Sequence, residues 1–113
     1  MKYLFLLYDN EDSWESMEEA KQNEVLGAYL AYSEALKKAD AFIGGEPLEH
    51  SRDSKRVRAS GVQDGPFADG KEQLGGFYMI EADNLDEALD WAARCPCAGF
   101  GHVEVRPVWN IGE

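Results

Sequence analysis

Asp64 is the side chain in this sequence that is best placed to move a proton. It begins the tetrapeptide DGPF within the stretch VQDGPFADGKEQLGG, residues 62–76. Pro66 fixes its own backbone and pushes the preceding glycine to extended conformations, and Phe67 can anchor the corner in apolar surroundings. A carboxylate held in such a rigid corner can serve as a general base. The alternative is structural, because aspartate is common in turns, where it accepts hydrogen bonds from its own backbone.

Two further segments carry polar side chains that are candidates for the same site as Asp64. Glu46 lies between a glycine pair and a proline, and His102 opens a strand whose alternation places Glu104 and Arg106 on its own side. If the valines of this strand face the helices, the polar side lines the opposite face of the sheet and can form a small-molecule pocket. A same-face ion pair that fixes a subunit seam explains Glu104 and Arg106 equally well. The predicted site has two sets of residues: catalytic Asp64, Glu46 and His102, and substrate-binding Tyr8, Tyr78, Glu104, Arg106, Pro66 and Phe67.

The motifs of several other chemistries are missing. The sequence contains no G-x-S-x-G, no phosphate-binding glycine loop, no G-x-G-x-x-G and no H-E-x-x-H, so acyl-transfer, nucleotide and zinc-protease chemistry has no support. Cys95 and Cys97 are too few for a disulfide framework, and the two histidines elsewhere do not supply a second ligand pair at metal spacing. We therefore expect reduced thiols, no bound metal and no cofactor.

Length and charge limit the kinds of partner. A chain of 113 residues is expected to form one domain, residues 1–113. With 11 basic and 22 acidic residues, its net charge of −11 repels phosphate backbones, so no nucleic-acid partner is expected. The basic cluster in SRDSKRVRAS, residues 51–60, favours a solvated hairpin face over an anion site. No segment has the apolar length of a signal peptide or a membrane span, which predicts a cytoplasmic protein that binds no membrane.

The hydrophobic pattern predicts two long helices between short strands. Ser16 and Glu19 form a capping box before apolar residues at helical spacing, so the first helix is expected from about Trp14 or Ser16 to Lys38. A second helix follows Asn84, which can cap it, and its apolar stripe has Leu89 near the middle. Strands are expected at residues 2–8, 41–48, 55–59, 76–82 and 102–109.

This order of elements indicates a ferredoxin-like α+β fold. Two β-α-β halves flank a short hairpin strand, and both helices are expected on one face of a mainly antiparallel sheet. The opposite face then carries alternate apolar residues of the first and fourth predicted strands. Because a second copy most simply covers such a face, we expect a homodimer that packs sheet against sheet.

Four ordered segments of the sequence carry a family resemblance. They are KYLFLLYDNEDSW, GGEPL, DGPFADGKEQLGGFYMIEADNLDEALDWAARCP and GHVEVRPV, and together they resemble the YCII-related, or DGPF-domain, family along nearly the whole chain. The resemblance implies a dimeric α+β barrel built from ferredoxin-like subunits. One branch of the family pairs a histidine in or near its first helix with an aspartate, and residues 20–23 of this chain hold no histidine, so that pair is not carried over.

Two functions follow from the residues and the resemblance. The first is a small-molecule enzyme with acid–base chemistry of the isomerase or lyase type, in a pocket on the sheet face at the dimer interface. The wider barrel superfamily holds isomerases, lyases, dehalogenases and small monooxygenases, so the fold alone does not decide the reaction. The second is a non-catalytic ligand-binding or accessory protein linked to an extracytoplasmic-function sigma factor circuit, because DGPF proteins are often encoded beside such factors. A plain interaction domain is a third possibility.

Overall fold

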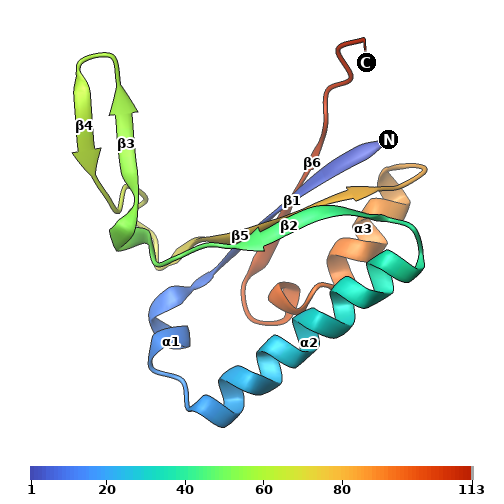
Figure 1. Cartoon of the computed structure of the whole chain (residues 1–113), viewed down its shortest axis with the longest axis horizontal. Coiled ribbons are helices and arrows are strands. Elements are labelled where there is room, and N and C mark those ends of the chain that lie inside the picture. The colour runs from blue at the N-terminus through green and yellow to red at the C-terminus, as the bar shows by residue number, and fades with distance from the viewer. Residues whose placement is uncertain (113) are drawn as a thin grey trace.

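The computed structural model describes residues 1–112 as a four-stranded sheet with its helices on one side (Figure 1). A separate two-stranded hairpin rises on the other side of the sheet. In chain order the elements are β1 (Lys2–Asn10), α1 (Glu11–Glu15), α2 (Glu19–Lys38), β2 (Phe42–Pro47), the 3-10 helix η1 (Ser51–Asp53), β3 (Lys55–Arg58), β4 (Gly61–Asp64), β5 (Glu72–Glu81), α3 (Leu85–Arg94), the 3-10 helix η2 (Pro96–Gly99) and β6 (His102–Pro107).

The sheet confirms the predicted ferredoxin-like α+β fold. Its strand order is β2-β5-β1-β6, and all three neighbouring pairs are antiparallel. The central strands β1 and β5 therefore come from different β-α-β halves, and each half contributes one edge strand. This interleaving places α2 and α3 side by side on the same face of the sheet (Figure 1).

The alternation of β1 divides the sheet into a buried face and an open face. Tyr3, Phe5 and Leu7 point toward the helices, where Phe5 is completely buried together with Leu36 and Ile80. A fully buried side chain of this kind contributes about 1.5 to 3 kcal/mol to folding. The other alternating residues of β1 are only partly buried and lie on the face without helices.

The first helical region differs from the prediction. The expected capping box at Ser16 is wrong, because the chain forms the short helix α1 first and α2 begins only at Glu19, without a side-chain cap. Asn10 caps α1 by accepting the N–H groups of residues 12 and 13 at 3.2 Å each. The Trp14 carbonyl then accepts the side-chain amide of Gln22 at 2.8 Å, which stabilises the break between the two helices.

The second helix is capped as predicted, and the predicted stripe is buried at Ala88 and Ala92 but not at Leu85 and Leu89. The Asn84 side chain accepts the Glu87 N–H at 2.9 Å. The helix α3 buries Ala88, Trp91 and Ala92, whereas Leu89 remains 45% exposed. The expectation of a buried Leu89 is therefore wrong, since Trp91 takes the inward position. Among residues 1–112, no helix is long and apolar enough to cross a membrane.

Two segments project from the face without helices (Figure 1). One is the β3–β4 hairpin, which forms its own sheet and does not pair with the main one. The other is the chain after β6, which leaves the sheet at Pro107, two residues before the expected end of that strand. The strand β5 begins at Glu72, four residues earlier than expected, so it carries the chain from the hairpin back into the sheet.

Candidate active site

A cavity of about 900 Å³ lies on the helix side of the sheet. Its walls come from the end of β1, from α1 and α2, from β2 and the loop after it, and from the middle of β5. Apolar side chains such as Trp14, Val25 and Tyr29 form much of the wall, and a few polar groups reach into it. This size and composition are typical of a site for a small organic ligand.

Asp9 lines this cavity, and its surroundings raise the pKa of its carboxyl group. It lies two residues after Leu7 on β1, so it points to the same side of the sheet and lines the cavity with Leu7. The register of β1 with β5 shifts between Leu7 and Tyr8 and leaves Gly75 unpaired next to Asp9. Burial raises the pKa of the Asp9 carboxyl, and the negative charges of Glu11 and Glu72 raise this pKa further. Because Asp9 lines the cavity, a ligand in the cavity can reach its carboxyl group.

Two glycines make room for Asp9. A Cβ atom on Gly75 would lie 3.1 Å from Oδ1 of Asp9, a contact tight enough to displace the carboxylate. A Cβ atom on Gly101 would collide with the Tyr8 carbonyl oxygen and approach the Asp9 Cα atom to 3.1 Å. Side chains at either position would therefore move the end of β1 that carries Asp9.

Buried hydroxyl and thiol groups on the helix side of the sheet stay protonated at neutral pH. Burial raises the pKa of Tyr29, and the hydroxyl of Tyr78 is hydrogen-bonded to the Ser33 hydroxyl at 2.9 Å. Burial also raises the pKa of Cys95 to about 12 and that of Cys97 to about 11. The cysteines therefore offer no thiolate nucleophile at neutral pH, whereas the tyrosine hydroxyls can donate hydrogen bonds to a ligand.

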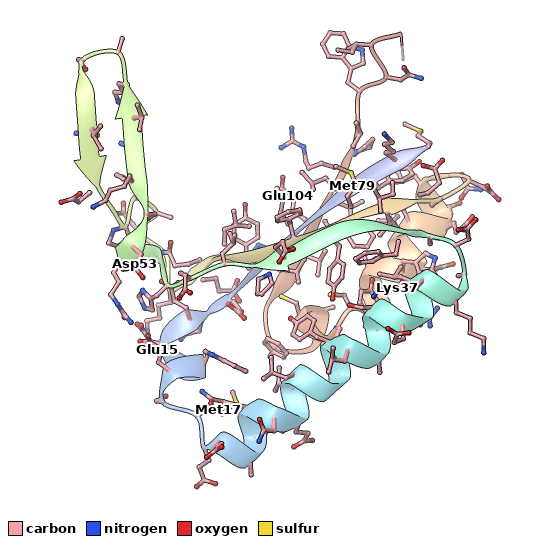
Figure 2. All side chains as sticks on the ribbon, viewed as in Figure 1. Glu15, Met17, Lys37, Asp53, Met79 and Glu104 are labelled. Carbon is pink, nitrogen blue, oxygen red and sulfur yellow. The ribbon has the colours of Figure 1, made fainter. Side chains whose placement is uncertain are left out.

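The mouth of the cavity is held by contacts between α1 and the foot of the hairpin. Glu11 accepts the Ser51 N–H at 2.9 Å and is also bonded to the Ser51 hydroxyl. Arg52 forms two hydrogen bonds with the Glu15 carboxylate, one of them 3.1 Å long, and these lower the pKa of Glu15. Figure 2 shows Glu15 on α1 close to the foot of the hairpin, where Asp53 is labelled.

His50 completes this clamp and pairs with an aspartate of α1. Its Nε2 atom lies 2.9 Å from Oδ1 of Asp12, and its Nδ1 atom accepts the Arg52 N–H at 3.1 Å. In the neutral imidazole the proton therefore sits on Nε2 and is donated to Asp12. His50, Asp12 and Glu15 also offer ligand atoms within 4.8 Å of one another. A metal would bind the lone pair of Nε2, but in this hydrogen-bonding pattern Nε2 carries the proton. The hydrogen bonds of His50 therefore fit a structural clamp better than a metal site.

Five of the predicted site residues share the face without helices. The register places Glu46 and Tyr8 on this face, together with His102, Glu104 and Arg106. The Tyr8 and His102 rings stack with centroids 4.8 Å apart, and Nδ1 of His102 lies 2.6 Å from the Glu72 carboxylate. Arg106 donates to Glu104 at 3.2 Å, so the two form the same-face ion pair that the sequence offered as an alternative.

The remaining predicted residues lie in other places. Asp64 is at the end of β4, where its exposed carboxylate accepts a hydrogen bond from Lys55 at 2.6 Å. Pro66 follows a cis peptide bond, and the Phe67 ring packs under Arg56 at 4.2 Å. Tyr78 faces the helices, which corrects the expectation that it lies on the same face as Tyr8.

The cavity thus contains few of the residues that the sequence singled out. Of the predicted site residues, Glu46 and Tyr78 line it, and the side chain of Glu46 alternates toward the other face. Asp9 and His50 were missed. The pair of glycines at 75 and 76 was the available signal for Asp9, because it indicated that another group approaches this backbone closely.

Comparison with known proteins decides the family. Residues 1–112 match the YCII-related domain. The chain belongs to the YCII-related family. An uncharacterized protein of Rhizobium meliloti (strain 1021) is 55% identical over 49 residues, which make up 42% of this chain and 40% of that relative, so the match spans less than half of either protein.

The solved structure of another protein has a similar fold along nearly the whole YCII-related chain. It is the 5-chloro-2-hydroxyhydroquinone dehydrochlorinase from Burkholderia phenoliruptrix AC1100, in complex with 2,5-dihydroxybenzoquinone. The TM-score is 0.58 at 23% sequence identity, and the alignment covers 99% of this chain and 96% of the other. At this level of identity the likeness establishes the shared α+β fold.

Proposed function

We propose that this YCII-related protein is a small-molecule enzyme that performs acid–base chemistry of the lyase or isomerase type. The observation that carries this proposal is the Asp9 carboxyl, which lines a large cavity and has a raised pKa. A group that moves protons in catalysis needs a pKa displaced toward the working pH, whereas a group that only binds a ligand does not. The dehydrochlorinase activity named for the structural neighbour is of the lyase type and agrees with the proposal.

The surroundings of Asp9 suit a proton-transfer step. Asp9 takes a proton from a carbon or hydroxyl group of the substrate, and the hydroxyls of Tyr29 and Tyr78 supply hydrogen bonds to substrate oxygens. This site differs from the sequence-based assignment, which gives the catalytic roles to Asp64, Glu46 and His102, and the two assignments are separated by experiment.

Chloride release from 5-chloro-2-hydroxyhydroquinone provides the first assay. This compound is named for the structural neighbour, and its elimination yields one chloride ion and one proton, so turnover is measured by ion chromatography. We expect Asp9→Asn to slow turnover by about 10² to 10⁴-fold, because it keeps the shape of the side chain but cannot take a proton. Asp90→Asn, an exposed change on α3, is the matched control and should leave the rate unchanged.

The outcomes separate the competing assignments. A loss of turnover in Asp64→Asn, with Asp9→Asn unaffected, would move the site to the DGPF corner. Binding of 2,5-dihydroxybenzoquinone without turnover of any compound in a panel of small hydroxylated rings would favour the non-catalytic ligand-binding function.

We also propose that the protein is a homodimer. The face without helices carries the half-buried residues Leu4, Leu6, Phe77 and Met79 in one patch, flanked by Tyr8 and the Glu104–Arg106 pair. Burial of this patch against a second copy would form a dimeric α+β barrel. A stable association of this kind is expected to bury at least about 1,000 Å² in total.

A further inference from the structure

The β3–β4 hairpin is folded without packing against the main sheet. Its two strands form a sheet of their own, and the hairpin projects away from the face without helices (Figure 1). The cross-strand pair Val57 and Val62 is 74% and 65% exposed. A two-stranded hairpin is at best marginally stable in water, so this one requires a surface to pack on.

The charge of the hairpin is opposite to that of the rest of the chain. Residues 55–64 carry three basic side chains and one acidic side chain, whereas the whole chain has 11 basic and 22 acidic residues. Lys55 pairs with Asp64, and Arg56 packs on Phe67 at the foot of the hairpin. Arg58 has no ion-pair partner among residues 1–112. The unpaired positive charge of Arg58 therefore lies near the tip of the hairpin.

The shape of the molecule leaves room for a second copy next to the hairpin. The segment after β6 projects on the same side of the sheet, and its Trp109 is 83% exposed (Figure 1). The two projections leave the same face of the sheet (Figure 1), and this face carries the patch formed by Leu4, Leu6, Phe77 and Met79. The radius of gyration is 15.5 Å, while a compact chain of this length would have about 13 Å. The hairpin and the segment after β6 extend the molecule beyond its sheet and helices (Figure 1).

We propose that the β3–β4 hairpin is an arm that grips a second copy of this chain. This inference rests on the proposed homodimer and adds the element that holds it. In a two-fold dimer each arm reaches past the sheet interface and places Val57, Val62 and Arg58 on the acidic surface of the other subunit. The contact is made twice because of the symmetry.

Charge favours a second copy over other occupants of the arm. The net charge of −11 repels nucleic acids and anionic membranes, which excludes most partners that a basic hairpin would otherwise bind. The rest of the chain, outside residues 55–64, has 8 basic and 21 acidic residues, so a second copy offers an acidic surface that attracts the basic arm, although the two whole chains have charges of the same sign. The root of the arm is also fixed, because residues 50–52 are clamped to α1 through Glu11, Asp12 and Glu15. The arm is therefore presented in a defined direction.

Sedimentation velocity over a dilution series tests the arm. We expect a dimer for the wild type, a dissociation constant raised about tenfold or more by Arg58→Glu, and a similar loss for the double change Val57→Ser and Val62→Ser. Lys21→Glu is the matched control, because it makes the same change of charge on the exposed surface of α2 and should alter the constant by less than about twofold. Far-ultraviolet circular dichroism verifies that each variant keeps its fold.

Hydrogen exchange of the wild type gives an independent measurement. Backbone amides of residues 55–64 should gain protection when the protein concentration rises through the dissociation constant, while amides in the middle of β1 stay protected throughout. If the arm variants formed dimers with the wild-type dissociation constant, the proposed role of the arm would be refuted, but the proposed homodimer would not. A wild type that is monomeric at micromolar concentration would overturn both. Neither result would bear on the role of Asp9, which the turnover assay decides separately.

Discussion

Removal of the Tyr32 hydroxyl tests the packing between α2 and α3. The hydroxyl is buried and donates to the Trp91 carbonyl at 2.7 Å. Trp91 lies in the last turn of α3, where carbonyl groups have no partner within the helix. Tyr32→Phe keeps the ring and its edge contacts but leaves this carbonyl buried and unpaired, which costs about 1 to 3 kcal/mol.

Tyr78→Phe is the matched control for this prediction. Its hydroxyl is bonded to the Ser33 hydroxyl at the cavity wall, where water can replace it, so the cost should be about 0.5 to 1.5 kcal/mol. For a chain of this length about 4 °C of melting temperature corresponds to 1 kcal/mol, so Tyr32→Phe should melt about 4 to 12 °C below the wild type. Differential scanning calorimetry measures both variants. If Tyr78→Phe were the more destabilised of the two, the assignment of the buried hydrogen bond would be refuted.

Three further predictions follow from the same structure. Leu36→Ala should cost about 2 to 5 kcal/mol in urea unfolding, because Leu36 is completely buried, and Leu89→Ala should cost less than half as much. The pKa of Asp9 is raised in the folded state, so its charged form destabilises the fold and wild-type stability falls as the pH rises from the unfolded pKa through the folded pKa. Asp9→Asn should lack this fall and should be more stable than the wild type at neutral pH. Thermal melts from pH 4 to 8 measure this difference. Asp64→Asn should change stability by about 1 kcal/mol or less, since its pair with Lys55 is exposed, and a larger loss in urea unfolding would indicate that the corner depends on this carboxylate.

The order of strands and helices along the chain was sufficient to predict the ferredoxin-like layout. Alternation divided β1 into two sets but did not decide which set is buried, whereas the stripe of α2 follows from the period of 3.6 residues and the Asn84 cap was visible three residues before its partner. The break after α1 was not predictable in the same way. Ser16 and Glu19 match a capping box, but Asn10 starts the helix earlier and Gln22 bonds back to Trp14, and such a contact depends on the turn geometry.

The candidate site was harder to predict because its parts meet only through tertiary structure. Asp9 ends a strand of ordinary appearance, and its raised pKa depends on Glu11, Glu72 and the cavity around it. His50 reaches Asp12 across 38 residues of chain, which no local pattern reveals. Leu89 faced outward because the larger Trp91 on the same helix occupied the inward position. The DGPF corner, by contrast, was visible in the sequence but lies in the exposed hairpin region, away from the cavity.

Carbon-detected NMR titration of the Asp9 side-chain carboxyl tests the central claim most directly. The proposed proton-transfer role predicts a titration midpoint above that of aspartate in unfolded peptides, and a further displacement when 2,5-dihydroxybenzoquinone occupies the cavity. The Asp9→Asn variant identifies the resonance. An Asp9 midpoint at the ordinary value for aspartate, unaffected by the added ligand, would contradict the assignment of Asp9 as the group that moves the proton.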